Sequence, residues 1–261
     1  MIIFAPQLII MLAGIPIIEV LQLHKRHNGS DEEALKGVDL SICEGENFGL
    51  LGPNAAGKTT LISIICGILK FNKGKVKVNE IDVARYPKQI RSIIGLVPQE
   101  IALYPNLTVK ENILFFGRMH GISGKSLKDK VDYFLDIVKL EQHQSKYVSR
   151  CSGGIKRRVN LVAGLIHDPS IIFLDEPTLG VDAQSRNLIF EFIEQLNRKG
   201  ATIIYTTHYI KEAENLCHRV MIIDNGNIVT SGTPEELINN HDNCTDLGQV
   251  FLKLTGKDLR E

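Results

Sequence analysis

At residues 52–60 the 261-residue chain reads Gly52-Pro53-Asn54-Ala55-Ala56-Gly57-Lys58-Thr59-Thr60. This stretch fits the pattern G-x-x-x-x-G-K-[ST], a glycine-rich turn whose backbone N–H groups surround a phosphate. An apolar strand is predicted just before the turn, over residues 47–51, and a helix just after it, over residues 58–69. A strand, this turn and a helix in that order are the context that makes the pattern a phosphate site.

Two residues of this stretch are suited to bind phosphate and a metal ion. The ammonium group of Lys58 can reach the β- and γ-phosphate oxygens of a nucleotide, and the hydroxyl group of Thr59 can bind Mg²⁺. The helix that begins there presents free N–H groups and the positive end of its dipole to the same phosphates. The alternative, a glycine turn beside a chance lysine, does not explain this context.

Two adjacent carboxylates follow a second apolar strand, predicted over residues 170–174. Asp175 ends that strand and can hold the coordination shell of Mg²⁺ at the carboxyl edge of the sheet, where such folds bind ligands. Glu176 is the next residue and points elsewhere, so its carboxylate is free to polarise an attacking water molecule. The alternative for Glu176 is a solvated acidic residue at a strand end.

Three further candidates have weaker signals when each is taken alone. Gln99 follows a strand predicted over residues 92–97, where an amide can contact both the metal and the water, and His208 follows a strand predicted over residues 201–206. Ser152-Gly153-Gly154 opens a helix whose N–H groups can bind an anion, and its glycines permit close backbone approach. The alternatives are a loop glutamine, a structural histidine and an ordinary serine-capped helix.

Strands and helices alternate along most of the chain, which is typical of a parallel sheet covered on both faces. Residues 17–23 and 40–42 are predicted to form an edge sheet, whereas residues 106–164 read as amphipathic helices. The sequence thus predicts an α/β fold with a mostly parallel sheet, an antiparallel edge β-subdomain and an α-helical subdomain inserted over about residues 100–164. Other predicted elements are helices over 109–119, 127–138 and 183–198, a hairpin over 220–223 and 228–230 around Asn225-Gly226, and a helix at Pro234 capped by Thr233 and Glu236.

The composition argues against several classes of protein. Lys plus Arg (30) equals Asp plus Glu (30), so no net positive charge attracts a nucleic acid, and none is expected as a partner. The five cysteines form no C-x-x-C pair, which favours reduced thiols over a zinc site or a disulfide framework.

The first eighteen residues contain one polar side chain, Gln7, and superficially suggest a membrane span or a signal sequence. Pro6, Gly14 and Pro16 interrupt this stretch, no basic segment precedes it, and it is barely long enough to span a bilayer. We therefore predict a short extension, residues 1–14, that leads into the first strand. A membrane anchor is the alternative.

These segments, taken together and in this order, resemble the ATP-binding subunit of an ABC transporter over nearly the whole chain from about Ile17. The resemblance implies a P-loop NTPase core, an ABC ATPase domain over residues 15–240 and a C-terminal tail over 241–261. The segments similar to the family's motifs are residues 52–60 (Walker A), Gln99 (Q-loop), Ser152-Gly153-Gly154 (signature motif), residues 171–176 (Walker B and catalytic glutamate), Leu179-Gly180-Val181-Asp182 (D-loop) and His208 (switch histidine).

The resemblance also implies a role for each residue. ATP and Mg²⁺ are the expected cofactors, and Glu176 is the expected catalytic base, with Gln99 and His208 assisting it. The residues expected to bind the nucleotide are Gly52, Pro53, Asn54, Ala55, Ala56, Gly57, Lys58, Thr59, Thr60, His27, Ser152, Gly153, Gly154 and Asp182, and those expected to bind Mg²⁺ are Thr59, Asp175 and Gln99.

In this family two ATP molecules lie between the Walker A segment of one copy and the signature motif of another. The resemblance therefore implies a head-to-tail homodimer or heterodimer on the cytoplasmic face of the cell membrane. Dimer closure would be transmitted to a separate membrane permease, which would contact this subunit at a groove near residues 99–107. Residues 152–158 and 250–256 resemble the branch whose permeases export drugs, polysaccharides or other substrates.

Three positions depart from the family pattern. Ala55 stands where glycine is usual, and it would cost about 1–2 kcal/mol if that position requires a positive φ. Cys151 replaces a leucine, and we expect it to be a small buried apolar residue. His27 stands where an aromatic ring stacks on adenine, so we expect a weakened contact with the base.

Two other functions compete with a transporter subunit. An ABC-type ATPase that acts on nucleic acid or ribosomes usually carries a long coiled-coil insertion or a second cassette, and this chain has neither. A P-loop kinase would leave Ser152-Gly153-Gly154 and His208 without a purpose.

Overall fold

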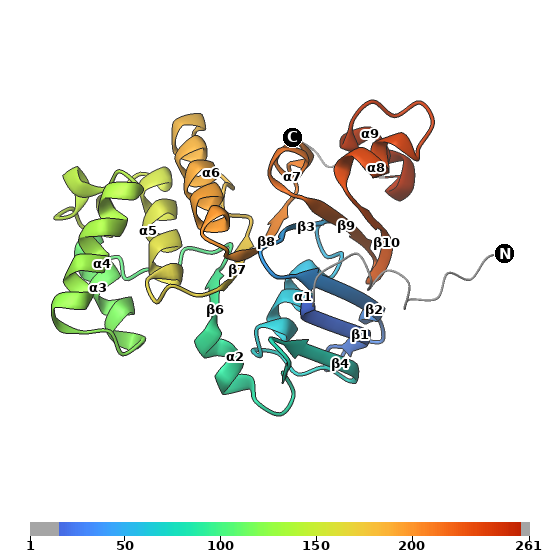
Figure 1. Ribbon diagram of the computed structural model, residues 1–261, viewed down its shortest axis with the longest axis horizontal. Coiled ribbons are helices and arrows are strands. Elements are labelled where there is room, and N and C mark those ends of the chain that lie inside the picture. Colours follow the sequence, from blue (N-terminus) through green and yellow to red (C-terminus); the bar gives the residue numbers. More distant parts are fainter. Residues whose placement is uncertain (1–15, 257–261) are drawn as a thin grey trace. The chain divides into compact units, whose positions relative to one another are not determined.

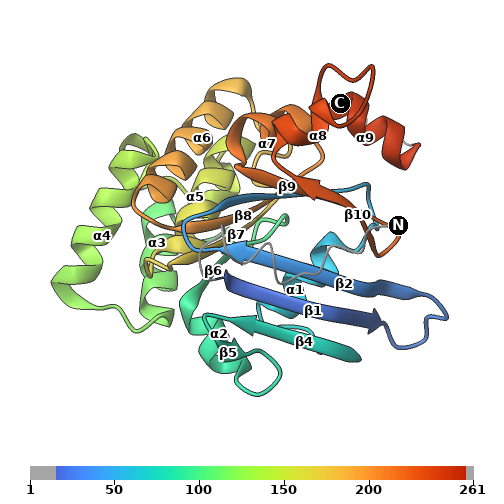
Figure 2. The same ribbon diagram turned by 45° about the vertical axis from the view of Figure 1, so that its right-hand side comes forward.

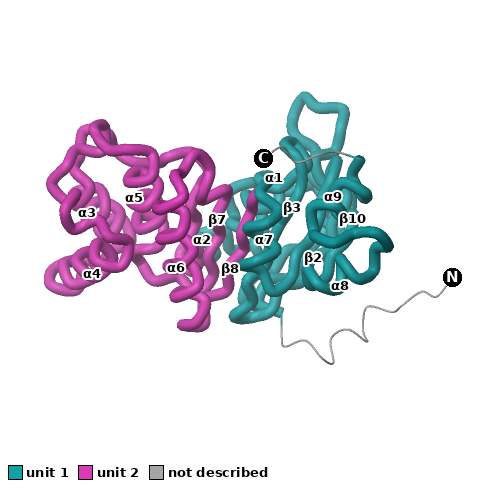
Figure 3. Tube along the Cα trace, turned by 90° about the horizontal axis from the view of Figure 1, so that it is seen from above, with its two compact units in different colours: residues 1–91, 208–261 teal, residues 92–207 magenta. Residues whose placement is uncertain are grey.

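The computed structural model describes residues 16–256, so the predicted extension over residues 1–14 lies outside the described part. The chain divides into two compact units (Figure 3). Unit 1 comprises Met1–Arg91 and His208–Glu261, and unit 2 comprises Ser92–Thr207. Among the helices of residues 16–256, none has the length and apolar character that crossing a bilayer requires.

The elements of both units are labelled in Figure 1. The strands are β1 (Pro16–Arg26), β2 (Glu33–Cys43), β3 (Asn47–Leu51), β4 (Lys73–Val78), β5 (Ile81–Asp82), β6 (Ile94–Val97), β7 (Ile171–Asp175), β8 (Thr202–Thr207), β9 (Arg219–Asp224) and β10 (Asn227–Gly232). The helices are α1 (Lys58–Ile65), α2 (Pro87–Ile93), α3 (Val109–Met119), α4 (Gly124–Ile137), α5 (Gly153–Leu165), α6 (Ala183–Arg198), α7 (Ile210–Leu216), α8 (Pro234–Asn239) and α9 (Leu247–Thr255), with 3-10 turns at Glu141–His143 and Val148–Arg150.

Unit 1 contains an antiparallel sheet of strands in the order β2-β1-β4-β5, and α1 packs against it (Figure 2). Strand β3 pairs in parallel with β9, and β9 turns back into antiparallel β10. The predicted hairpin is confirmed, since Asn225 (φ 48°) and Gly226 (φ 77°) are both left-handed, as a primed two-residue turn requires. The capping box of α8, formed by Thr233 and Glu236, is also confirmed.

Unit 2 contains the parallel strands β6, β7 and β8, with β7 in the middle. Every residue of β7 and β8 is buried, as in a parallel sheet covered on both faces. Helices α3, α4 and α5 pack together (Figure 1), and Arg158 of α5 donates to the carbonyl groups of Val138 (2.7 Å) and Lys139 (3.2 Å) at the end of α4. The predicted bounds of α3 and α6 are confirmed.

Several predictions differ from the observed elements: α4 spans Gly124–Ile137 rather than 127–138, and the strand predicted over 40–42 is the end of the longer β2, Glu33–Cys43. Helix α1 ends at Ile65 rather than at residue 69 because Gly67 is left-handed (φ 66°), a conformation that stops a helix. The strand predicted over 92–97 begins only at Ile94, since the two preceding residues close the unpredicted helix α2. Strand β4 was missed, although Lys75, Val76, Lys77 and Val78 alternate charged and apolar side chains as a strand does.

The turn between β3 and α1 depends on left-handed backbone at two positions. Gly57 has φ 111°, and a Cβ atom there would lie 2.7 Å from the carbonyl oxygen of Ala34, so only glycine fits. Ala55 has φ 63°, which confirms that alanine occupies a strained conformation where the related family has glycine.

Two histidine rings stack where α3 and α5 end. The rings of His120 and His167 are 3.8 Å apart and nearly parallel, at 3°. His167 Nε2 lies 3.2 Å from the carbonyl oxygen of Ile94, so it carries the proton of the neutral ring, and the buried Nδ1 atom has no hydrogen-bond partner within the described chain. Desolvation lowers the pKa of both rings. At His167, the charge of the neighbouring His120 ring lowers the pKa further.

We predict that Ala55→Gly increases the free energy of unfolding by up to about 1 kcal/mol, because relief of the left-handed strain exceeds the added entropy of the unfolded chain. Urea denaturation with an unchanged m-value measures this. Ala84→Gly is the matched control, since Ala84 is an exposed loop alanine without a positive φ. It should lose about 0.4–1 kcal/mol. An equal loss in Ala55→Gly would show that Ala55 is not strained.

The stacked histidines predict a loss of stability in mild acid. A histidine whose pKa is lower in the folded chain binds more protons in the unfolded one, so its contribution is present above pH about 6.5 and is lost as the pH falls. His120→Gln should therefore flatten the dependence of the unfolding free energy on pH between about 7 and 5. The nearby charges of Asp168 and Lys130 remain in both proteins. The same slope in both would contradict this prediction.

Candidate functional site

In unit 1, the turn at residues 52–60 places its lysine at the start of α1. Lys58 Nζ donates hydrogen bonds to the carbonyl oxygens of Gly52 (2.6 Å) and Pro53 (3.0 Å), and only 7% of Lys58 is exposed. A Cβ atom at Gly52 would lie 2.3 Å from the carbonyl oxygen of Ile223. The backbone is thus fixed tightly around the lysine, and the first turn of α1 begins at the same place, so the arrangement fits an anion.

His27 lies on the same side of unit 1 as this turn. His27 Nε2 is 3.3 Å from Thr60 Oγ1, and the exposed ring borders a cavity of about 800 Å³ that Ala55 also lines. The ring therefore lies beside the turn at residues 52–60, which we call the phosphate turn. A base attached to phosphates bound there could reach the ring. The other residues that line this cavity are Arg26, Ser30, Asp31, Glu32, Glu33, Ala34, Lys36, Asn225 and Gly226.

In unit 2, the two carboxylates at the end of β7 are held by the neighbouring strand. Thr206 Oγ1 of β8 donates to Asp175 Oδ1 at 2.6 Å and accepts a hydrogen bond from the backbone N–H of Glu176 at 3.0 Å. Asp175 and Glu176 are each 6% exposed. One threonine hydroxyl therefore fixes the direction of the first carboxylate and the backbone of the second.

The backbone changes direction at Glu176. This residue has φ 48°, an uncommon conformation for a side chain of its size, and such positions cluster at functional sites. Its carboxylate turns toward Gln99, whose Nε2 donates to Glu176 Oε2 at 3.3 Å. The structure thus brings together the glutamine and the glutamate that the sequence singled out.

The segments Ser152-Gly153-Gly154 and Asp182 also meet in unit 2. Ser152 is the N-cap of α5 and accepts a hydrogen bond from Ile155 N at 3.4 Å. A Cβ atom at Gly154 would lie 2.3 Å from Ser185 Oγ and 2.8 Å from Asp182 Oδ2, so this glycine permits α5 to approach the start of α6. Asp182 caps α6, and the hydrogen bond from Ser185 N lowers the pKa of its carboxyl group.

The remaining predicted residues lie as follows. His208 stands between β8 and α7, with its ring 4.2 Å from that of Tyr209. Cys151 is 8% exposed, as predicted for a small buried residue, and all five cysteines are free. His27, residues 52–60 and His208 belong to unit 1, whereas Gln99, Ser152-Gly153-Gly154, Asp175, Glu176 and Asp182 belong to unit 2.

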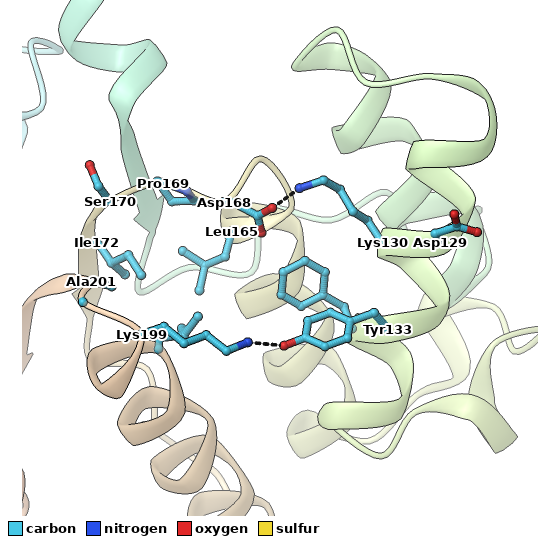
Figure 4. A pocket seen from close by; sticks show the side chains of 13 residues that line it. Asp129, Lys130, Tyr133, Leu165, Asp168, Pro169, Ser170, Ile172, Lys199 and Ala201 are labelled. Carbon is cyan, nitrogen blue, oxygen red and sulfur yellow. Dashed lines mark hydrogen bonds and ion pairs between the residues drawn. The ribbon is translucent and has the colours of Figure 1, made fainter.

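A second cavity, of about 650 Å³, lies in unit 2 between α4, the segment before β7 and the end of α6 (Figure 4). None of the predicted site residues lines it. Three of its charged side chains interact with other side chains of the rim, since Lys130 forms an ion pair with Asp168 and Lys199 Nζ donates to the Tyr133 hydroxyl at 2.5 Å.

Sequence reasoning missed three residues of the site. Thr206 fixes the carboxylate of Asp175 and the backbone of Glu176, and the available signal was a threonine at the carboxyl end of a fully buried strand. Arg157 and Asn160 contact the main chain around Gln99, and no local pattern distinguishes them from other polar residues on α5.

Most of this chain is similar in sequence to proteins of a known family. The sequence profile of the ABC transporter family matches residues 35–179. The linearmycin resistance ATP-binding protein LnrL of Bacillus subtilis is 42% identical over 228 residues, which are 87% of this chain and 71% of that protein. The Nod factor export ATP-binding protein I of Paraburkholderia xenovorans is 39% identical over 221 residues, 85% of this chain and 72% of that protein.

Solved structures agree with the sequence relatives. An ATP-binding subunit of an ABC transporter superposes with a TM-score of 0.83 at 27% identity, covering 92% of this chain and 99% of that one. A dimeric ATP-binding cassette in a post-hydrolysis state, bound to ADP and Pi, has a TM-score of 0.75 at 28% identity and covers 83% of this chain and 98% of that one. The predicted α/β fold is thereby confirmed. This chain belongs to the ABC transporter family, in which it is an ATP-binding subunit that hydrolyses ATP.

Proposed function

We propose that this chain powers export through a separate membrane permease by ATP-driven dimerisation. The names of its relatives support the direction, since one confers linearmycin resistance and another serves Nod factor export. The dimeric cassette bound to ADP and Pi supports the mode of action. The chain would be a peripheral subunit that binds the permease on the cytoplasmic face of the membrane.

The phosphate turn would hold Mg·ATP. Lys58, whose amine lies against the turn, would bind the phosphate oxygens, and the N-terminus of α1 would add its N–H groups. In nucleotide sites Mg²⁺ keeps phosphate and water ligands besides one or two protein oxygens, and Thr59 and Asp175 can supply those oxygens, with Gln99 assisting. The metal would neutralise charge on the phosphates when bound.

Glu176 would act as the general base for the attacking water. Its low exposure, its left-handed backbone and its contact with Gln99 support this role, because an aligned carboxylate loses little freedom when it accepts a proton. His208 would assist at the carboxyl end of the next strand. Asp175 is not the proposed base, because the hydrogen bond from Thr206 holds its carboxylate against β8.

Ser152-Gly153-Gly154 would complete the nucleotide site of a second copy. The start of α5 presents N–H donors, and the close packing of Gly154 on Asp182 joins this segment to the proposed D-loop. We propose that each copy therefore brings one phosphate turn and one anion-binding helix start, in a homodimer or heterodimer. Residues 15–240 would form the ATPase domain, with the helices of about 100–164 as its inserted subdomain.

The segment at residues 99–107 would meet the permease. Ile101 is 39% exposed and Tyr104 is 48% exposed, and the Tyr104 ring packs edge-on against Phe115 of α3 at 4.6 Å. Exposed aliphatic and aromatic side chains gathered on one segment suit a protein contact rather than solvent. Co-purification of this chain with a membrane permease would support this contact. Recovery with nucleic acid would favour the competing class of ABC ATPase.

Glu176→Gln tests the proposed base. We predict that this variant keeps its affinity for ATP, loses at least about 100-fold in turnover because the amide cannot accept the proton, and elutes as a dimer when ATP is present. Turnover and size-exclusion chromatography measure this. Glu191→Gln, an exposed glutamate of α6, is the matched control and should behave as the wild type. Normal turnover in Glu176→Gln would refute the assignment.

His27→Tyr tests the proposed contact with adenine. A larger ring should stack more extensively, and we predict an increase in ATP affinity of about fivefold, corresponding to about 1 kcal/mol. Calorimetric titration measures it. Inorganic triphosphate lacks the base, so its affinity should be equal in both proteins. Unchanged ATP affinity in the variant would exclude stacking at this position.

A further inference from the structure

Two buried side chains of α5 hold the main chain around Gln99. Arg157 Nη1 donates to the carbonyl oxygens of Gln99 (2.7 Å) and Pro98 (3.3 Å). Asn160 Nδ2 donates to the carbonyl oxygen of Pro98 at 3.3 Å, and Asn160 Oδ1 accepts from Ala102 N at 3.0 Å. The segment therefore rests on α5 through four hydrogen bonds from two residues, one helical turn apart.

The Arg157 guanidinium occupies a costly position. Arg157 is 5% exposed, and burial lowers its pKa, while the carboxylates of Glu176 and Asp175 act in the opposite direction. Its Nη1 atom donates instead to uncharged acceptors, the carbonyl oxygens of Pro98 and Gln99. An apolar side chain would be cheaper to bury here. The arginine is therefore better explained by the geometry that its donors impose than by stability.

The next residue along the helix has a different task. Arg158 Nη1 donates to the carbonyl oxygens of Val138 and Lys139, and Arg158 Nε donates to that of Gly154. These contacts close the C-terminal end of α4 and fasten it to α5. The adjacent arginines thus serve different neighbours, and only Arg157 touches the segment that carries Gln99.

The position of the Gln99 backbone decides what its side chain can reach. The amide already lies at 3.3 Å from Glu176 Oε2, near the outer limit of a hydrogen bond, while the carbonyl oxygen of the same residue is held at 2.7 Å. A small displacement of the backbone would break the contact with Glu176. Helix α5 begins at Ser152-Gly153-Gly154, so the element that anchors Gln99 is also the one proposed to contact a second copy's nucleotide.

We propose that Arg157 is a positioning residue. Its hydrogen bonds anchor the main chain of Gln99 to α5, the helix that starts at the signature segment. This anchoring holds the Gln99 amide beside Glu176. This inference rests on the proposed roles of Gln99 and Glu176. The Arg157 guanidinium donates to carbonyl oxygens of the main chain, so we assign it no direct contact with the reacting groups. Its effect on the reaction passes through Gln99.

A double-mutant cycle with Gln99 tests this inference on the full-length chain. Arg157→Gln should lower kcat by about tenfold with less than about a twofold change in KM for ATP, because the phosphate turn is untouched. In a Gln99→Ala background the same substitution should cost less than about twofold, because no amide remains to be positioned. Arg157→Lys keeps a charge but loses the fork of donors, so its kcat should fall between the wild type and Arg157→Gln.

Arg91→Gln is the matched control, because Arg91 also donates to a carbonyl oxygen, that of Gly67 at 2.6 Å, at an exposed position. It should keep the wild-type kcat. Thermal melting checks that each variant is folded, and Asn160→Ala provides a second route to the same loss if Arg157→Gln does not fold.

The outcomes separate the inference from the function on which it rests. Full turnover in Gln99→Ala would refute the proposed role of Gln99. Reduced turnover in Gln99→Ala, together with an equal cost of Arg157→Gln in both backgrounds, would overturn the positioning role alone. An unchanged kcat in folded Arg157→Gln would overturn it too.

Discussion

The candidate site in unit 2 depends on the contacts of one hydroxyl group, that of Thr206. It joins β8 to β7 at the point where both strands end, binding the carboxylate of Asp175 and the backbone N–H of Glu176. Two adjacent acidic residues are thereby given different environments, one locked beside the strand and one turned toward Gln99. The different orientations of these two side chains therefore depend on one short side chain in a buried strand.

Much of the fold could be predicted because its signals are local. The apolar runs of β3 and β7, the cap of α8 and the Asn225-Gly226 turn each depend on a few neighbouring residues. Predictions were wrong where a distant contact or a single backbone angle decides. Gly67 ends α1 early, and β4 is recognised fully only through its pairing with β1.

The candidate site divides in the same way. Residues 52–60, Asp175 and Glu176 follow from sequence because their chemistry requires a fixed spacing. Thr206, Arg157 and Asn160 could not be found, since each acts on residues far away in the chain, through hydrogen bonds that only the folded structure reveals. Local sequence thus identifies the candidate reacting groups, whereas tertiary structure identifies the side chains that contact and orient them.

The proposed function requires that each copy holds an incomplete site, whose phosphate turn is completed by the start of α5 from another copy. The most direct measurement is the rate of ATP hydrolysis per mole of chain as the chain concentration is varied. If hydrolysis needs two copies, this specific rate rises steeply at low concentration, as dimers form, and then reaches a plateau. A constant specific rate in a preparation that stays monomeric throughout would contradict it.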